Sequence, residues 1–283
     1  MDAVITGAST GIGRSAVKVL VGHGWRVFAG VRKVADVESL RQEFGEAVEP
    51  LLFDVTDAAA VYRAADETRV KLGGHTLMGL VNNAGLAIGG PLAHQPINQI
   101  RRVFEANTLG AVTVSQAFIP LLGADPSLSG GPGRIVNISS VAGRIAAPFL
   151  GDYAMSKHAL EAFSDSLRRE LMIYGIDVIV IGPGAIATPI WDKAEATDDS
   201  AYADSDYGPV LKRFKTTLVN RGRQGLPVER LGETIHLALT VAKPRARYVV
   251  LRNRFVNWTL PMLLPKRVLD CLIAWALGLT RRR

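Results

Sequence analysis

Short apolar runs alternate with longer segments of helical periodicity along most of the chain. The apolar runs, rich in β-branched residues, cover residues 3–6, 26–29, 48–53, 77–81, 134–139, 177–181 and 248–251. Segments with apolar residues every three or four positions cover residues 14–23, 34–44, 58–72, 98–122, 153–174 and 228–241. Strands and helices that alternate in this way are typical of a parallel sheet with helices on both faces. The pattern predicts an α/β fold: a single doubly wound domain whose mostly parallel, seven-stranded sheet is flanked by helices, plus a C-terminal helical extension.

No Ser- or Pro-rich linker and no internal repeat divides the chain, so we expect one domain over residues 1–254 and an extension over residues 255–283. Residues 190–227 are the least regular part of that domain. Acidic and aromatic residues gather there: Asp198, Asp199, Asp204, Asp206, Trp191, Tyr202, Tyr207 and Phe214. A long irregular segment in a compact domain is usually a lid or a disordered insert. We expect a substrate-binding lid, whose aromatic residues either contact an apolar substrate or pack the segment onto the body.

The overall composition excludes several classes of protein. With 283 residues, 48% hydrophobic and 21% charged, the chain is composed like a globular protein and unlike a disordered one. The single cysteine, Cys271, excludes an intramolecular disulfide and a cysteine-based zinc site, and it fits a reducing compartment. No basic and apolar signal sequence follows Met1. We therefore expect a cytoplasmic protein, and we expect no metal site.

The formal net charge of +7 belongs to the end of the chain. Residues 243–283 carry a balance of +9, which leaves −2 for the first 242 residues. The charged residues of this tail are Lys243, Arg245, Arg247, Arg252, Arg254, Lys266, Arg267, Arg281, Arg282 and Arg283, with Asp270 as the one acid. The tail contains no recognised nucleic-acid motif and no aromatic stacking platform, so we expect no nucleic-acid partner.

The same tail is rich in apolar residues, among them Trp258, Leu260 and Met262. Its final apolar run, residues 271–279, is shorter than the roughly 20 residues that a membrane-spanning helix needs. Two interpretations remain open. Residues 255–283 either contact a membrane surface, which makes the protein peripherally membrane-associated, or form a helix that packs over the substrate pocket or against another subunit.

A glycine-rich turn follows the first predicted strand and precedes a helix. It reads Thr6, Gly7, Ala8, Ser9, Thr10, Gly11, Ile12 and Gly13. Glycines permit a tight turn and a close backbone approach, and the free N–H groups at a helix start attract a pyrophosphate. Glycine also occurs in turns for purely conformational reasons, but the position between a strand and a helix is what a dinucleotide site requires.

Tyr153 and Lys157 are four residues apart at the start of a predicted helix, so they share one helical face. A phenol has an ordinary pKa near 10, and a neighbouring ammonium group favours the phenolate and lowers that pKa. We therefore expect Lys157 to make Tyr153 a general acid or base. Taken singly, Tyr153 is also compatible with a packed aromatic residue and Lys157 with a solvated charge.

Together with Asn82–Asn83–Ala84–Gly85 and Ser140, these motifs resemble the short-chain dehydrogenase/reductase family of Rossmann-fold enzymes. The resemblance runs from about Val4 to Thr188 and includes a segment from Pro183 to Thr188. It implies a catalytic set of Asn107, Ser140, Tyr153 and Lys157, in which Ser140 bonds the substrate oxygen and Asn107 holds a water beside the lysine. It also implies a homodimer or homotetramer. Of the adjacent Ser139 and Ser140, Ser139 is expected to have a structural role. The alternative role for Asn107 is to form hydrogen bonds with the backbone.

The resemblance also implies a cofactor set of Gly7, Ser9, Thr10, Gly11, Ile12, Gly13, Arg32, Asp54, Val55, Asn83, Ala84, Gly85, Tyr153, Lys157, Pro183, Gly184, Ile186 and Thr188. Ile186 and Thr188 are expected at the nicotinamide, and Asp54 at the adenine. Arg32 follows the second strand, at the position that discriminates between the two cofactors. An acidic residue there would bind the ribose hydroxyls of NAD(H), whereas a guanidinium binds the 2′-phosphate of NADP(H). This favours NADP(H), with NAD(H) possible. Asp36 is an acidic residue close to Arg32 in the sequence, but we expect it to belong to the start of the next helix. The alternative role for Asp54 is a helix N-cap.

The leading hypothesis is an NADP(H)-dependent oxidoreductase that interconverts an alcohol and a ketone or aldehyde. The aromatic lid and the tail favour a lipophilic small-molecule substrate, such as a steroid, a retinoid or a lipid. The alternative is a non-catalytic NAD(P)-binding regulator or scaffold of the same fold. The presence of Ser140, Tyr153 and Lys157 together counts against it, because a non-catalytic protein need not retain all three.

Overall fold

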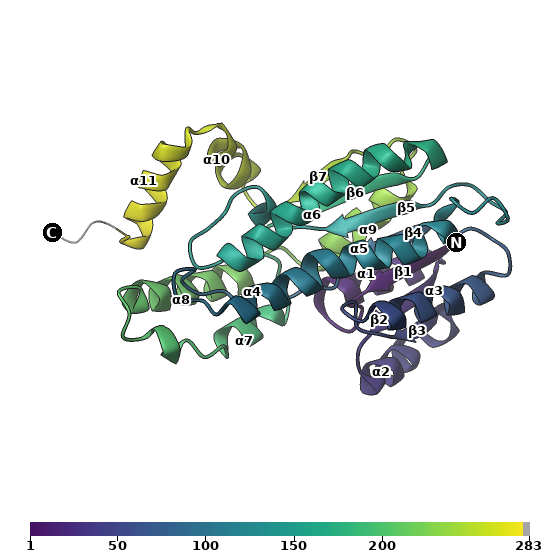
Figure 1. Cartoon of the computed structure of the whole chain (residues 1–283), viewed down its shortest axis with the longest axis horizontal. Coiled ribbons are helices and arrows are strands. Elements are labelled where there is room, and N and C mark those ends of the chain that lie inside the picture. The colour runs from purple at the N-terminus through teal and green to yellow at the C-terminus, as the bar shows by residue number, and fades with distance from the viewer. Residues whose placement is uncertain (280–283) are drawn as a thin grey trace.

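The computed structural model describes residues 1–279, in which seven strands form one parallel sheet (Figure 1). The strands are β1 (Asp2–Thr6), β2 (Arg26–Val31), β3 (Val48–Leu52), β4 (Gly79–Asn82), β5 (Arg134–Ile138), β6 (Asp177–Pro183) and β7 (Arg247–Val250). Their order is β3-β2-β1-β4-β5-β6-β7, and every neighbouring pair is parallel. The predicted doubly wound α/β fold is confirmed. Arg281, Arg282 and Arg283 of the basic tail lie outside the described residues.

Helices cover both faces of the sheet. Those of the main body are α1 (Gly11–Gly22), α2 (Val34–Phe44), α3 (Ala58–Leu72), α4 (Ile97–Phe104), α5 (Gly110–Phe118), α6 (Gly151–Glu170) and α9 (Glu229–Thr240). Asp36 lies in the first turn of α2, as the sequence indicated. The helix predicted over residues 98–122 is divided into α4 and α5 by a π-helical turn at Glu105–Leu109.

Alternating strand residues build two hydrophobic cores. In β1, Val4 faces the core formed with α3, α5 and α6, whereas Ala3 and Ile5 face the core formed with α1 and α9. These strand side chains are fully buried. Burial on both faces explains why the strands read as continuous apolar runs in the sequence.

The segment expected to be irregular, residues 190–227, is largely helical. It forms α7 (Ile190–Glu195) and the longer α8 (Gly208–Arg223), which lie together at one end of the sheet, away from the N-terminus (Figure 1). Tyr207 and Phe214 pack against Phe149 with ring centroids 6.1 and 5.4 Å apart. Tyr207 and Phe214 therefore help to pack this segment onto the body. The expected lid, and contact between its aromatic residues and a substrate, stay predictions.

The C-terminal extension contains a π-helical turn at Phe255–Thr259, then α10 (Leu260–Leu263) and α11 (Lys266–Leu277). Figure 1 shows α10 and α11 standing off the body near α8. Leu277 and Leu279 pack against the cluster of Phe149, Tyr202 and Leu211 that holds the lid. Within residues 1–279, no helix has the length and apolar content that crossing a membrane requires.

Candidate active site

The glycine-rich turn joins β1 to α1 and depends on the backbone conformation and close packing of its glycines. Gly7 and Gly11 adopt φ angles of +65° and +56°, which favour glycine. A Cβ on Gly13 would lie 2.2 Å from the Gly7 carbonyl oxygen. The N-cap residue Thr10 makes no side-chain capping bond, and the first turn of α1 carries no acidic residue. The first amides and the positive end of the α1 dipole are therefore open to an anion.

Asn83 holds this turn in place from the neighbouring strand end. Its amide nitrogen donates to the carbonyls of Thr6 (2.9 Å) and Gly7 (3.1 Å). In return, the Thr6 hydroxyl accepts hydrogen bonds from the backbone N–H groups of Asn83 and Ala84, both at 3.0 Å. The Asn83 side chain thus contacts the turn, and Thr6 is a partner that the sequence reasoning did not single out.

Asn107 and Lys157 converge on Gly85. A Cβ on Gly85 would lie 2.9 Å from Asn107 Oδ1 and 3.7 Å from Lys157 Nζ, so glycine leaves room for both. The Asn107 amide nitrogen donates to the Leu86 carbonyl (2.8 Å) and to Ser156 Oγ (3.0 Å), and Oδ1 accepts from Leu86 N (2.7 Å). Backbone bonding is therefore what this side chain does in the structure. Its role in holding a water stays a prediction.

Ser140 and Tyr153 face one another from different elements. Ser140 follows β5, and its hydroxyl oxygen accepts a bond from the Ala142 N–H (3.1 Å), which leaves its own hydrogen available for donation. Burial raises the pKa of the Tyr153 phenol, and a side-chain hydrogen bond with Ser140 offsets part of the rise. The neighbouring Ser139 has a buried hydroxyl with no partner among residues 1–279.

Lys157 lies one turn after Tyr153 on α6 and is 5% exposed. Its ammonium donates to the Ile138 carbonyl (2.8 Å) and sits 5.8 Å from the centre of the Tyr153 ring. Burial lowers the pKa of Lys157 to about 8, against the attraction of Glu161. The expected lowering of the Tyr153 pKa by Lys157 is not found in the protein alone: burial raises this pKa, and the opposing effect comes from the hydrogen bond with Ser140.

The residues expected at the adenosine lie together beyond β2 and β3. Arg32 Nη1 is 3.5 Å from Asp54 Oδ2, and the Arg32 side chain is 70% exposed. Burial acts to raise the pKa of Asp54, but hydrogen bonds from Thr56 and the Arg32 guanidinium outweigh it and lower that pKa. Asp54 is not a helix N-cap: Asp57 caps α3 by accepting from Ala60 N (3.0 Å). Val55 packs against the core beside α5.

The segment after β6 returns toward the glycine turn. A Cβ on Gly11 would lie 3.5 Å from Thr188 Cβ, so Thr188 stands beside the start of α1. Ile186 is buried, and its carbonyl accepts the indole N–H of Trp191 (2.6 Å). Pro183 ends β6, and Gly184 N donates to the Val250 carbonyl (2.9 Å).

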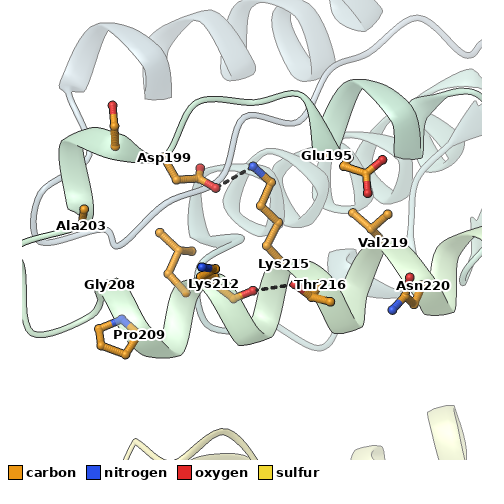
Figure 2. Close-up of a pocket in the computed structure, with 12 residues that line it drawn as sticks. Glu195, Asp199, Ala203, Gly208, Pro209, Lys212, Lys215, Thr216, Val219 and Asn220 are labelled. Atoms are coloured by element: carbon orange, nitrogen blue, oxygen red, sulfur yellow. Dashed lines mark hydrogen bonds and ion pairs between the residues drawn. The ribbon is translucent and has the colours of Figure 1, made fainter.

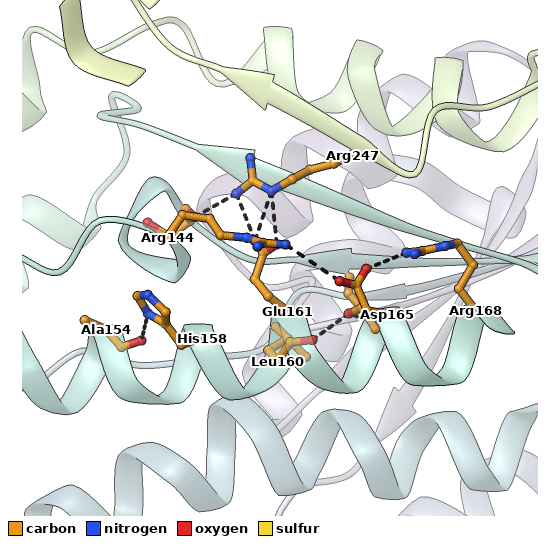
Figure 3. Close-up of polar contacts among 11 residues, drawn as sticks. Arg144, Ala154, His158, Leu160, Glu161, Asp165, Arg168 and Arg247 are labelled. Carbon is orange, nitrogen blue, oxygen red and sulfur yellow. Dashed lines mark hydrogen bonds and ion pairs between the residues drawn. The ribbon is translucent and has the colours of Figure 1, made fainter. Parts of the chain in front are cut away.

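Figure 3 shows an ion-pair network in which Arg247 and Arg144 converge on Glu161. Glu161, on α6 and one turn after Lys157, is 4% exposed. It accepts two close hydrogen bonds from Arg247, from Nη2 (2.8 Å) and from Nε (3.0 Å), and a third from Arg144 Nε (3.2 Å). The sequence reasoning missed both Glu161 and Arg247. The spacing of four from Lys157 could have pointed to Glu161, but no local signal points to Arg247.

Two cavities border residues 190–227, the segment expected to form a lid. One of about 500 Å³ lies between α7 and α8 and is lined by Leu211, Val219, Lys212 and Lys215 among others; Figure 2 shows Lys215 turned toward Asp199. Its lining includes none of the four predicted catalytic residues. The other, about 380 Å³, is lined by Ile88, Gly89 and Tyr202. Gly89 N donates to Asp152, the residue before Tyr153 in the chain, but the lining of this second cavity also includes none of the four predicted catalytic residues.

The described residues fit a nicotinamide dinucleotide. The open N-terminus of α1 suits a pyrophosphate, and the exposed Arg32 guanidinium suits a phosphate on the ribose. Thr188, expected at the nicotinamide, stands beside Gly11 of the turn. Gly7 and Gly13 have no room for a Cβ, so the turn that shapes this site depends on glycine at both positions.

Comparison with known proteins gives concordant results. A family model described as short chain dehydrogenase matches residues 2–199. The chain is 40% identical to an NADPH-dependent 3-dehydrocapnine reductase from Ornithobacterium rhinotracheale, covering 95% of this chain and 94% of the relative. It is 34% identical to retinol dehydrogenase 5 of Mus musculus, covering 96% and 87%. Among solved structures, a short-chain dehydrogenase from Streptomyces avermitilis superimposes with a TM-score of 0.76 at 26% identity, covering 97% and 95%.

Proposed function

The chain belongs to the short-chain dehydrogenase/reductase family and is an oxidoreductase acting on CH–OH groups, and from this premise we propose that it interconverts a lipophilic alcohol and its ketone or aldehyde. NADP(H) is the favoured cofactor. When bound, it supplies or accepts the hydride. The observation that carries the proposal is the meeting of Ser140, Tyr153 and Lys157 at the edge of the sheet where α1 opens.

In the proposed mechanism, the Ser140 hydroxyl donates a hydrogen bond to the substrate oxygen, because its own oxygen is already engaged by Ala142 N. Tyr153 then moves a proton to or from that oxygen. The Lys157 ammonium, held by the Ile138 carbonyl, supplies positive charge near the phenol. Lys157 and Asn107 flank Gly85, and we propose that they pass the proton onward to solvent.

The names of the relatives support a lipophilic substrate, since a curated relative is a retinol dehydrogenase. Phe149 of the body packs with Tyr202 and Phe214 of the expected lid, and Tyr202 lines the second cavity, so this aromatic cluster provides apolar surface there. We further propose that the lid of residues 190–227 closes over the substrate. The homodimer or homotetramer expected from the sequence stays a prediction.

The proposal is tested with Tyr153→Phe and with Tyr174→Phe as the matched control, since Tyr174 is exposed and follows the C-terminal end of α6, whereas Tyr153 lies in its first turn. All-trans-retinal, a ketosteroid, a long-chain ketone and cyclohexanone are offered with NADPH and with NADH. We expect Tyr153→Phe to lower turnover by about 10²–10⁴-fold while NADPH affinity, measured by fluorescence titration, stays within about twofold of wild type. Unchanged turnover in Tyr153→Phe removes the mechanism.

We also propose that the extension contacts an anionic lipid surface. Phe255, Val256 and Leu263 are 66%, 57% and 74% exposed, and Arg254 and Lys266 flank them. Exposed apolar side chains bordered by cations are typical of a helix lying in a membrane interface.

Flotation of the full chain with vesicles tests this contact. We expect binding to phosphatidylglycerol vesicles, weaker binding to phosphatidylcholine vesicles, and loss of binding in the triple variant Phe255→Ser, Val256→Ser, Leu263→Ser. The control replaces Val70 and Ile173, two exposed apolar residues of the body, by serine. Equal failure of the wild type and the triple variant to float rejects the contact.

A further inference from the structure

Arg247 connects the C-terminal extension to Ser140, because it contacts both Trp258 of the extension and the Ser140 carbonyl. Arg247, on β7, has a side chain that is 17% exposed and is therefore largely removed from water. Its Nη2 donates both to Glu161 Oε1 (2.8 Å) and to the Ser140 carbonyl (3.2 Å). One guanidinium thus joins β7, the helix that carries Lys157, and the backbone of Ser140. Lysine cannot make this set of bonds because it lacks the planar fork of donors.

Trp258 of the extension covers that guanidinium. The Arg247 Cζ lies 4.4 Å from the centre of the Trp258 ring, within the range of a cation–π interaction. Trp258 is half-buried, in contrast to its exposed neighbours Val256 and Asn257. The indole excludes water from one side of Arg247, which strengthens the bonds on the other side.

A turn at residues 253–257 positions Trp258 against the Arg247 guanidinium. Asn253 adopts a φ of +49°, a left-handed conformation that asparagine tolerates better than most residues. Asn257 closes the turn: its N–H donates to the Asn253 carbonyl (3.0 Å) and its side chain to the Arg252 carbonyl (2.9 Å). The fold also makes room for the arginine, because a Cβ on Gly182 would lie 2.4 Å from Arg247 Nη2.

We propose that Arg247 and Trp258 are positioning residues for the reaction: Trp258 holds Arg247, and Arg247 holds the backbone of Ser140 against α6. This inference rests on the proposed function of Ser140. According to this inference, the extension helps to position a catalytic residue, independently of any contact between the extension and lipid. A displaced Ser140 slows the chemical step while the cofactor site, at the other strand ends, is unaffected.

Full-length Trp258→Ala is the main variant, with Trp258→Phe as the conservative replacement. Trp275→Ala is the matched control, because Trp275 also belongs to the extension but is 80% exposed. With all-trans-retinal as probe, we expect Trp258→Ala to lower kcat by about tenfold, since small displacements of a catalytic group are costly. Trp258→Phe restores most of the loss, NADPH affinity stays within about twofold, and Trp275→Ala behaves as wild type.

A second measurement needs no turnover. Amide hydrogen exchange of the NADPH-bound protein reports on peptides covering residues 139–145. We expect faster exchange there in Trp258→Ala and in Arg247→Lys, and no change in Trp275→Ala or Trp258→Phe. Unaltered exchange in Trp258→Ala, or equal loss of kcat in Trp258→Ala and Trp275→Ala, overturns the inference. If the wild type turns over none of the carbonyl probes, the proposed function fails, and the exchange measurement still decides the coupling of Trp258 to Ser140.

Discussion

Replacing Lys157 by methionine is expected to stabilise the cofactor-free protein while it removes activity. Burial lowers the pKa of Lys157 from 10.5 to about 8. At 1.36 kcal/mol per pH unit, this shift corresponds to a cost of roughly 3 kcal/mol for keeping the charged ammonium in the folded protein. Methionine removes the charge and has a similar shape. It also removes the hydrogen bond to the Ile138 carbonyl (2.8 Å), which costs about 1.5 kcal/mol. The net expectation is a gain of about 1–2 kcal/mol at pH 7.

The pH dependence distinguishes this explanation from others. Below pH 8, Lys157 is charged in both the folded and the unfolded chain, so the full cost is present. Between about pH 8 and 10.5, the unfolded chain binds more protons than the folded one, and the wild type gains stability as the pH rises. The advantage of Lys157→Met is therefore largest at pH 7 and is lost by about pH 10.

Thermal melting of the cofactor-free proteins at pH 7, 9 and 10 measures this difference. A gain of 1–2 kcal/mol corresponds to a melting temperature about 2–6 °C higher at pH 7. Lys71→Met is the control: hydrogen bonding to Glu49 raises the pKa of Lys71, and its side chain is 34% exposed. We expect that variant to lose less than about 1 kcal/mol. If Lys157→Met melts several degrees below wild type at pH 7, burial of the charge does not dominate and the reasoning is wrong.

Three further substitutions test the cofactor site and the fold. Arg32→Ser is expected to weaken NADPH binding by about 10–100-fold and NADH binding much less, measured by fluorescence titration, because a charge-assisted bond to phosphate is lost; equal weakening contradicts the NADP(H) preference. Gly13→Ala is expected to abolish NADPH binding, since its Cβ would lie 2.2 Å from the Gly7 carbonyl, whereas Gly22→Ala meets nothing within 4 Å and binds as wild type. Asp57→Ala removes the N-cap of α3 and is expected to lower stability by about 1 kcal/mol in denaturant melts; no change refutes the capping role.

Most of the fold could be predicted because its strands are buried on both faces and its helices are locally periodic. The lid was different. Apolar residues of α8 such as Val210, Leu211 and Val219 are spaced for a helix but lie among lysines, arginines and glycines. A helix with so weak a local signal is stabilised by tertiary packing, here against Phe149, about 60 residues earlier in the chain. The π-helical turn at Glu105–Leu109 has almost the same periodicity as the helices beside it, so the sequence does not distinguish it.

The candidate site was predictable where its geometry is local. Tyr153 and Lys157 share a helical face because they are four residues apart. Asp54 and Asp57 both precede α3, and only the capping geometry shows that Asp57 is the N-cap. The bond between Arg247 and Glu161 spans 86 positions and joins β7 to α6. Helical and strand periodicity relate only residues that are close in the sequence, so they do not predict this ion pair. The pairing depends on the fold, which brings β7 and α6 together.

With Tyr153 as the proposed proton donor, we expect the protonation states of the cofactor-free site to suit reduction of a carbonyl better than oxidation of an alcohol. Reduction requires Tyr153 to carry the proton that it donates, and burial raises the pKa of the phenol and so keeps the proton in place at neutral pH. Oxidation requires the phenolate, which the protein alone disfavours. Lys157 stays mainly charged below its pKa of about 8. In the proposed mechanism, this charge, 5.8 Å from the centre of the Tyr153 ring, stabilises the phenolate left after proton donation. Both groups are therefore in the states that reduction needs at neutral pH, whereas a shift toward oxidation depends on whatever the bound cofactor adds to the charge beside Tyr153.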